Sequence, residues 1–206
     1  MTGQPKRVGT ISGASRGIGA AIASHLGAAG WDLSLGMRRP SALASAPDAL
    51  LNSICNAGVM FPKSAITATE AEMAAMFNVN VFAPQRLAQA AWKGLAASGR
   101  GRIVVIASLS GKRVASANSG AYAMSKFAAL GLTHALRHAG WEQGIRATAI
   151  CPGFVATDKA RAITDMDPAA MTQPEDVARL VQLALDLPNT ASVPEIGVNA
   201  RIEGSL

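Results

Sequence analysis

Short apolar runs alternate along the chain with segments whose apolar residues recur at helical spacing. Continuous apolar and β-branched runs are typical of buried strands, whereas recurrence every three or four positions is typical of amphipathic helices. This pattern predicts strands at 8–12, 33–37, 54–58, 102–108, 145–151 and 195–199. It predicts helices at 18–29, 69–87, 119–139 and 172–188.

Capping residues and prolines define the ends of several predicted helices. Thr69 followed by Glu72, and Thr172 followed by Glu175, both fit the capping box. In that motif two side chains and two backbone N–H groups pair reciprocally at a helix start. Pro84 lies inside the second predicted helix, and we expect it to kink that helix because proline has no N–H to donate.

The order of these elements predicts an α/β fold, in one domain over residues 1–206. Strands that alternate with helices favour a Rossmann-like, doubly wound parallel sheet with right-handed crossovers and helices on both faces. Ligands of such a sheet bind beyond the carboxyl ends of its strands. We therefore expect the functional residues directly after the strands.

The composition is typical of a folded domain without membrane spans. Half of the 206 residues are hydrophobic and 16% are charged, which is enough apolar material to bury a core. The most apolar stretch is interrupted by His25 and Asp32, so we expect no membrane partner. Without a recognisable signal peptide, a cytoplasmic location is expected. Cys55 and Cys151 lack the spacing of metal ligands or of a disulfide framework, and are expected to be buried.

The net charge favours a small anionic ligand. The chain has a formal net charge of +6 but only 4% aromatic residues. Its basic residues are scattered, and aromatic side chains on which bases could stack are few, so we expect no nucleic-acid partner. A small phosphorylated ligand explains the positive charge with fewer assumptions.

A glycine-rich turn follows the first predicted strand, within "SGASRGIGAAI" at 12–22. Its three glycines have the spacing G-x-x-x-G-x-G. Such a turn allows the backbone to approach a pyrophosphate closely and to start a helix whose N–H groups face the anion. A plain strand-to-helix turn is the alternative. The residues expected to contact the cofactor here are Gly13, Ser15, Arg16, Gly17, Ile18 and Gly19.

Arginines near this turn bear on the choice of cofactor. Arg16 lies within it, and Arg38 and Arg39 follow the second predicted strand, where Met37 stands in place of an acid. In nicotinamide enzymes an acid at this point binds the ribose 2′-hydroxyl, whereas arginine accommodates a 2′-phosphate. The arginines therefore favour NADP(H) over NAD(H), with solvated surface arginines as the alternative.

The order of several motifs resembles the short-chain dehydrogenase/reductase (SDR) family in its classical form. "GASRGIG" is similar to the family's cofactor turn, "NAG" at 56–58 to its motif after the fourth strand, and "CPGFVAT" at 151–157 to its segment beside the nicotinamide. The resemblance covers nearly the whole chain. It implies cofactor contacts also at Asn56, Ala57, Gly58, Tyr122, Lys126, Pro152, Gly153, Val155 and Thr157.

The resemblance also assigns a catalytic set: Ser108, Tyr122, Lys126 and Asn80. Tyr122 is the single tyrosine, and Lys126 follows one helical turn later, so both are expected on one face. A free phenol has a pKa of about 10, and we expect the Lys126 ammonium to lower it. Ser108, at a strand end, is expected to polarise a carbonyl. The family implies that Lys126 also holds the cofactor's ribose and that Asn80 holds a water linked to Lys126.

The sequence thus predicts an NADP(H)-dependent oxidoreductase that transfers hydride between the nicotinamide and a carbonyl compound or secondary alcohol. Tyr122 would be its general acid/base. The segment after "PGFVAT" is expected to form a mobile lid over the substrate. The resemblance also implies a homodimer or homotetramer. A catalytically weak NADP(H)-binding sensor or scaffold is the alternative.

That alternative is motivated by a departure from the family pattern. Only 16 residues, 40–55, separate Arg39 from Asn56, where the pattern places a helix, a third strand and another helix. About 30 residues, one βα unit, are lacking by this comparison. The chain is truly shortened, a segment is missing from the printed sequence, or something replaces the third strand. We favour a missing segment, because losing an interior strand would leave a hole in a parallel sheet.

Overall fold

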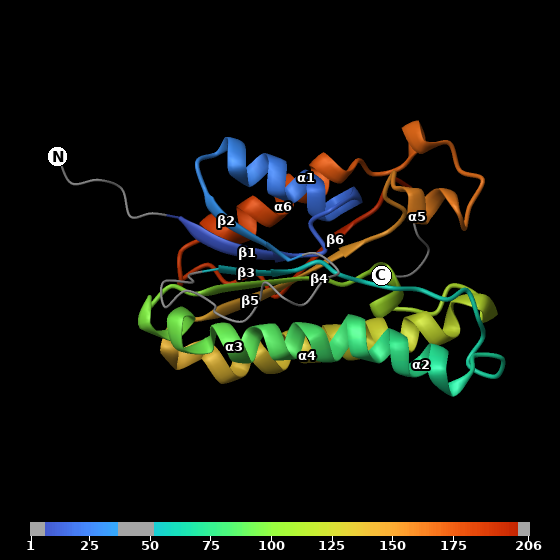
Figure 1. Ribbon diagram of the computed structural model, residues 1–206, viewed down its shortest axis with the longest axis horizontal. Coiled ribbons are helices and arrows are strands. Elements are labelled where there is room, and N and C mark those ends of the chain that lie inside the picture. The colour runs from blue at the N-terminus through green and yellow to red at the C-terminus, as the bar shows by residue number, and fades with distance from the viewer. Residues whose placement is uncertain (1–6, 37–51, 202–206) are drawn as a thin grey trace.

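The computed structural model describes residues 7–36 and 52–201. Six parallel strands form one sheet with helices on both faces (Figure 1). The predicted Rossmann-like fold is therefore confirmed. The strands, in the sheet order β2-β1-β3-β4-β5-β6, are β2 (Asp32–Gly36), β1 (Val8–Ser12), β3 (Asn52–Cys55), β4 (Arg102–Ile106), β5 (Arg146–Pro152) and β6 (Glu195–Val198).

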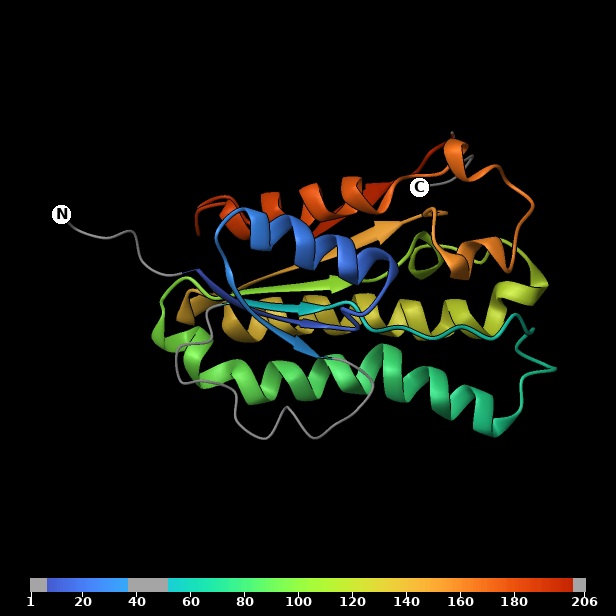
Figure 2. The same cartoon turned by 45° about the horizontal axis from the view of Figure 1, so that its top comes forward.

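Two helices cover each face of the sheet. Helices α1 (Gly17–Ala28) and α6 (Pro174–Asp186) pack together on one face, and α3 (Ala83–Ala97) and α4 (Gly120–Gly140) lie on the other (Figures 1 and 2). The short helices α2 (Glu70–Phe77) and α5 (Asp158–Arg161) lie towards the carboxyl ends of the strands. No helix in the part of the chain that the structure describes is long and apolar enough to span a membrane.

The central strand β4 explains how the two helical layers share one sheet. Successive side chains of a strand point to opposite faces. Val104 and Ile106 pack in the cluster under α1 and α6, whereas Ile103 and Val105 pack in the cluster under α3 and α4. All five residues of β4 are buried. Such burial on both faces is why this strand is a continuous apolar run.

The long helix before β4 differs from the prediction. Its start is confirmed, because Thr69 and Glu72 form the capping box at the beginning of α2. The helix does not end near residue 87 but continues through a π-helical turn, Asn78–Phe82, into α3, which ends at Ala97. Pro84 lies in the first turn of α3, directly after the π-helical turn, and the expected kink stays a prediction. There its missing N–H is tolerated, and the irregular turn precedes it.

The predicted capping box at the start of α6 is wrong. The capping residue is Gln173 rather than Thr172, and it pairs with Asp176 rather than Glu175. The Gln173 N–H donates to the Asp176 carboxylate at 3.1 Å. Pro174, at the first helical position, fixes this register, because proline is favoured there. Thr172 instead pairs with Val155 in an isolated parallel bridge.

The order of the sheet overturns one argument about the short connection after β2. Within the described residues every strand pairs with its neighbours without a gap, and β1 lies between β2 and β3. A further βα unit after β2 would therefore add a strand outside β2, at the edge of the sheet. Its loss leaves no hole, so that reason for favouring a missing segment was wrong. The connection itself, 37–51, lies outside the described residues.

Candidate active site

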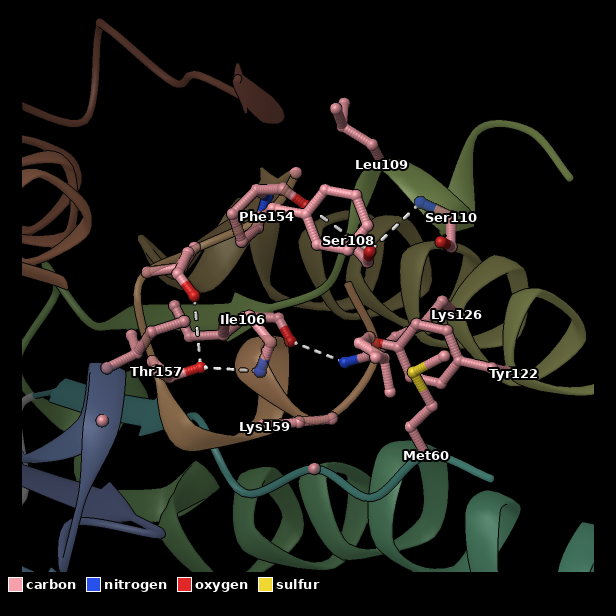
Figure 3. Close-up of a pocket in the computed structure, with 18 of the residues that line it drawn as sticks. Met60, Ile106, Ser108, Leu109, Ser110, Tyr122, Lys126, Phe154, Thr157 and Lys159 are labelled. Atoms are coloured by element: carbon pink, nitrogen blue, oxygen red, sulfur yellow. Dashed lines mark hydrogen bonds between the residues drawn. The ribbon is translucent and has the colours of Figure 1, made fainter. Parts of the chain in front are cut away.

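One cavity of about 590 Å³ lies at the carboxyl ends of the strands, as the fold predicts (Figure 3). It is lined by the glycine-rich turn, the "NAG" segment, three of the four predicted catalytic residues and the "PGFVAT" segment. The predicted residues that line it are Gly13, Ser15, Arg16, Gly17, Ile18, Asn56, Ala57, Gly58, Ser108, Tyr122, Lys126, Pro152, Gly153, Val155 and Thr157. Gly19 and Asn80 do not line it, and Arg38 and Arg39 lie outside the described residues.

The glycine-rich turn requires its glycines. Gly13 and Gly17 have positive φ angles of 68° and 53°, which side chains disfavour. A Cβ at Gly19 would overlap the Gly13 carbonyl oxygen, and one at Gly13 would lie 2.9 Å from the Ala57 Cα. Without these side chains the backbone of the turn packs closely against Asn56 and Ala57 and forms a cradle at the start of α1. Its chemistry fits the pyrophosphate of a dinucleotide.

Asn56 ties this turn to the end of β3. Its side-chain amide donates to the carbonyl oxygens of Ser12 at 3.1 Å and Gly13 at 3.0 Å. The Ser12 hydroxyl accepts from the backbone N–H groups of Asn56 and Ala57. Strand β3 ends at Cys55, so the predicted strand 54–58 extends too far. The "NAG" residues instead turn away to make these bonds, and Asn56 shapes the cradle as well as lining it.

Asn80 has a similar clamping role between the segment after β3 and helix α4. It is 2% exposed in the π-helical turn. Its amide oxygen accepts from the Val59 N–H, and its amide nitrogen donates to the Val59 carbonyl and to the Ser125 hydroxyl, each at 2.9 Å. Asn80 thereby joins the segment after β3 to helix α4. The predicted water between Asn80 and Lys126 stays a prediction.

Tyr122 and Ser108 come together as predicted. Ser108 lies after β4, where its hydroxyl accepts from the Ser110 N–H at 3.1 Å and donates to the Pro152 carbonyl at 3.4 Å. The Tyr122 phenol, on α4, lines the same cavity as Ser108. Burial raises the pKa of Tyr122 to about 12, and the neighbouring Ser108 hydroxyl opposes that shift only in part. The expected lowering of this pKa by Lys126 is therefore wrong, and the phenol is protonated at neutral pH.

Lys126 shares the face of Tyr122 but is itself strongly affected by burial. Its Nζ lies 5.7 Å from the centre of the Tyr122 ring and donates to the Ile106 carbonyl at 2.9 Å. Burial, and then the charge of Lys159, lower the pKa of Lys126 to about 7. Lys126 is thus only partly charged near neutral pH, which explains why it does not stabilise a Tyr122 phenolate here.

The "PGFVAT" segment leads into the expected lid and brings in a residue that the sequence analysis missed. Thr157 caps α5, and a Cβ at Gly17 would lie 3.1 Å from the Thr157 methyl, so the segment expected to form the lid begins against the glycine-rich turn. Two residues later, Lys159 Nζ lies 5.2 Å from the centre of the Tyr122 ring. Lys159 stands in a polar segment without a motif, and nothing in the sequence marked it.

The fold and the cavity together define a dehydrogenase-type domain. The family model for short chain dehydrogenases matches residues 48–168. The chain therefore belongs to the short-chain dehydrogenase family of oxidoreductases, whose members use a nicotinamide cofactor and act on small molecules.

Individual proteins are similar to most of this chain. The chain is 36% identical over 219 residues to an agropine synthesis reductase of Rhizobium rhizogenes, covering 89% of this chain but only 50% of that protein. It is 32% identical to the protein FixR of Bradyrhizobium diazoefficiens, covering 96% of this chain and 86% of FixR. The chain thus spans half the length of the first relative.

A solved structure supports both the fold and the family. A short chain dehydrogenase from Burkholderia cenocepacia, in complex with NADP, superposes with a TM-score of 0.80 at 28% identity. The match covers 95% of this chain and 96% of that one. The arrangement of strands and helices described above is therefore that of an established oxidoreductase fold.

Proposed function

We propose that this protein is an NADP(H)-dependent oxidoreductase that interconverts a carbonyl compound and the corresponding alcohol. One observation carries the proposal. The protonated Tyr122 phenol lines the same cavity as Ser108, Lys126 and the glycine-rich turn. These are the groups needed to bind a dinucleotide and to exchange a proton with a substrate oxygen.

Each part of the cavity would have its own role in this reaction. The glycine-rich turn and the start of α1 would hold the diphosphate. When bound, the nicotinamide supplies or accepts the hydride. Ser108 donates a hydrogen bond to the substrate carbonyl oxygen and orients it. During reduction Tyr122 gives its phenolic proton to that oxygen, and during oxidation the phenolate takes the proton back.

Lys126 would support Tyr122 by two routes. Its amine can donate to ribose hydroxyls, and in its protonated form it would stabilise the phenolate that proton transfer leaves behind. Its bond to the Ile106 carbonyl holds the Nζ on the side of the cavity nearest Tyr122.

Three arginines and a related structure support a preference for NADP(H) over NAD(H). Arg16 lines the cavity at the glycine-rich turn, and Arg38 and Arg39 follow β2 in the sequence. Arginine is suited to a 2′-phosphate. The related Burkholderia cenocepacia enzyme was solved with NADP. A cytoplasmic location and assembly as a homodimer or homotetramer stay predictions from the sequence.

Replacing the phenol tests the proposal. Tyr122→Phe should lower turnover of a carbonyl panel by about 10²–10⁴-fold, because the general acid is lost. NADPH binding, followed by fluorescence titration, should stay within about twofold of the wild type and shows that the variant is folded. NADPH should also be oxidised faster than NADH by the wild type.

Two results would count against this function. Tyr122→Phe turnover close to the wild-type rate would remove Tyr122 from the chemistry. Tight NADPH binding by the wild type without turnover of any carbonyl or alcohol would instead favour the sensor or scaffold.

A further inference from the structure

The cavity holds an excess of positive charge that the cofactor turn does not explain. Among the described residues that line it, Asp158 is the single acid, and its carboxylate pairs with Arg161 at 3.1 Å. That acid therefore does not neutralise the cavity. The basic side chains that line it are Arg16, Arg113, Lys126, Lys159 and Arg201.

Two of these cations, Arg16 and Lys159, lie at different places in the cavity. Arg16 belongs to the glycine-rich turn and faces the expected diphosphate. Lys159 comes from the lid and lies beside the reacting group, with its Nζ 5.2 Å from the centre of the Tyr122 ring. Figure 3 shows Lys159 on the lid side of the cavity, with Tyr122 and Lys126 across from it. Lys159 is thus close to where a substrate must place its carbonyl.

The cations repel one another in the absence of an anion between them. Desolvation, and then the charge of Arg16, lower the pKa of Lys159 to about 8, and after desolvation the charge of Lys159 further lowers the pKa of Lys126. Both shifts show that these positive charges act on each other across the cavity. A negatively charged group bound beside Lys159 would relieve this repulsion.

We propose that Lys159 binds an anionic group of the substrate, so that the enzyme prefers carbonyl compounds carrying a carboxylate or phosphate a few bonds from the carbonyl carbon. This inference rests on the proposed oxidoreductase function. An ammonium on a flexible stem suits such a group as a point charge. Arg201 lines the same cavity, with its guanidinium 5.9 Å from the Phe154 ring, and supplies a second cation.

The same chemistry is present in the cofactor's diphosphate, so the experiment must separate the two anions. The probes are 4-oxopentanoate and its neutral analogue 4-oxopentanamide, which share the carbonyl and differ in charge. Wild type, Lys159→Met and Lys159→Arg are compared by kcat/KM for both probes and by Kd for NADPH. Lys93→Met removes one positive charge from the exposed surface of α3 and serves as the matched control.

We expect the wild type to prefer the acid over the amide by at least tenfold. Lys159→Met should reduce that ratio at least tenfold, and Lys159→Arg should retain most of it, while Lys93→Met leaves it as in the wild type. Equal losses for acid and amide in Lys159→Met, together with a raised Kd for NADPH, would assign Lys159 to the cofactor and overturn the proposal. No preference for the acid in the wild type would overturn it too.

A binding measurement keeps this test apart from that of the proposed function. If neither probe is turned over, calorimetric titration of pentanoate and pentanamide into the NADP⁺ complex replaces the kinetics. Tighter binding of pentanoate that is lost in Lys159→Met would support the anion site even in a protein without this reductase activity. Equal binding of both compounds would refute it.

Discussion

At the scale of single residues, the structure shows that proximity does not fix the charge of a side chain. Tyr122 and Lys126 lie on one helical face, as their spacing predicts. Their pKa values nevertheless move apart, to about 12 and about 7, because burial favours the neutral form of each. The sequence reveals the pair but not the depth at which it is buried, so its charge state could not be predicted.

The depressed pKa of Lys126 predicts a pH dependence of stability. Between pH 7 and 8.5 the folded protein loses this proton while the unfolded chain, with a lysine pKa of about 10.5, keeps it. The unfolded state then binds more protons, so the free energy of unfolding rises with pH. Lys126→Met should reduce this rise by on the order of 1 kcal/mol. Urea unfolding followed by tryptophan fluorescence at both pH values measures it.

Lys93→Met is the control for this measurement and should keep the wild-type rise. If Lys126→Met shows the same rise as the wild type, the lysine is charged in the folded protein throughout this range.

At the scale of elements, the helix formed by α2, the π-helical turn and α3 carries a side chain that joins separate parts of the fold. A π-helical turn shifts the register of the helix, and this one contains Asn80. All three of its hydrogen bonds go to the segment after β3 or to α4. The sequence identified Asn80 by resemblance, but the irregular turn could not be predicted because propensity and pattern describe regular helices.

Removing the amide should therefore cost stability. Asn80→Ala leaves the Val59 N–H and carbonyl without these partners, and an unsatisfied buried group costs about 1–3 kcal/mol. We expect the free energy of unfolding to fall by about 2 kcal/mol or more, measured by urea unfolding. Gln89→Ala, an exposed amide on α3, is the control and should change little. Equal stability of Asn80→Ala and the wild type would show that the clamp is dispensable.

At the scale of the whole molecule, the fold was predictable because its layers follow from the alternation of buried strands and amphipathic helices. Most predicted element ends agree within three residues. The site was predictable where motifs mark it, as at Gly13 and Tyr122. It was not predictable at Lys159, because only the three-dimensional course of the segment after "PGFVAT" brings that side chain to the cavity.

Long-range ion pairs also escape sequence patterns. Glu195 on β6 accepts from Lys112 Nζ at 2.9 Å and contacts His134 Nε2 at 2.7 Å. Lys112 follows the 3₁₀ turn Leu109–Gly111, and His134 lies on α4. This cluster therefore ties the edge of the sheet to the segment that carries Ser108.

Glu195→Gln should weaken this tie in a pH-dependent way. The bond from Lys112 is the largest cause that lowers the pKa of Glu195 below its usual 4.5. The stabilisation from this pair is therefore present above pH 4.5, and it is lost as the pH falls through the pKa of Glu195 in the folded protein. Because the pair is partly exposed, we expect a loss of about 0.5–1 kcal/mol at pH 6 that shrinks towards pH 3. Thermal unfolding at several pH values measures it.

Glu142→Gln, an exposed carboxylate beyond α4, is the control and should show no such trend. A difference between Glu195→Gln and the wild type that stays constant from pH 6 to pH 3 would argue against an ionic contribution.

The mutual repulsion of Lys126 and Lys159 has a consequence for ligand binding. An anion that neutralises the lid lysine removes one cause of the low Lys126 pKa, which then moves back towards its ordinary value. Near neutral pH the complex must therefore take up a fraction of a proton from solution. Binding heats would then vary with the ionisation enthalpy of the buffer, and the occupied enzyme would hold its amine more fully charged than the empty one.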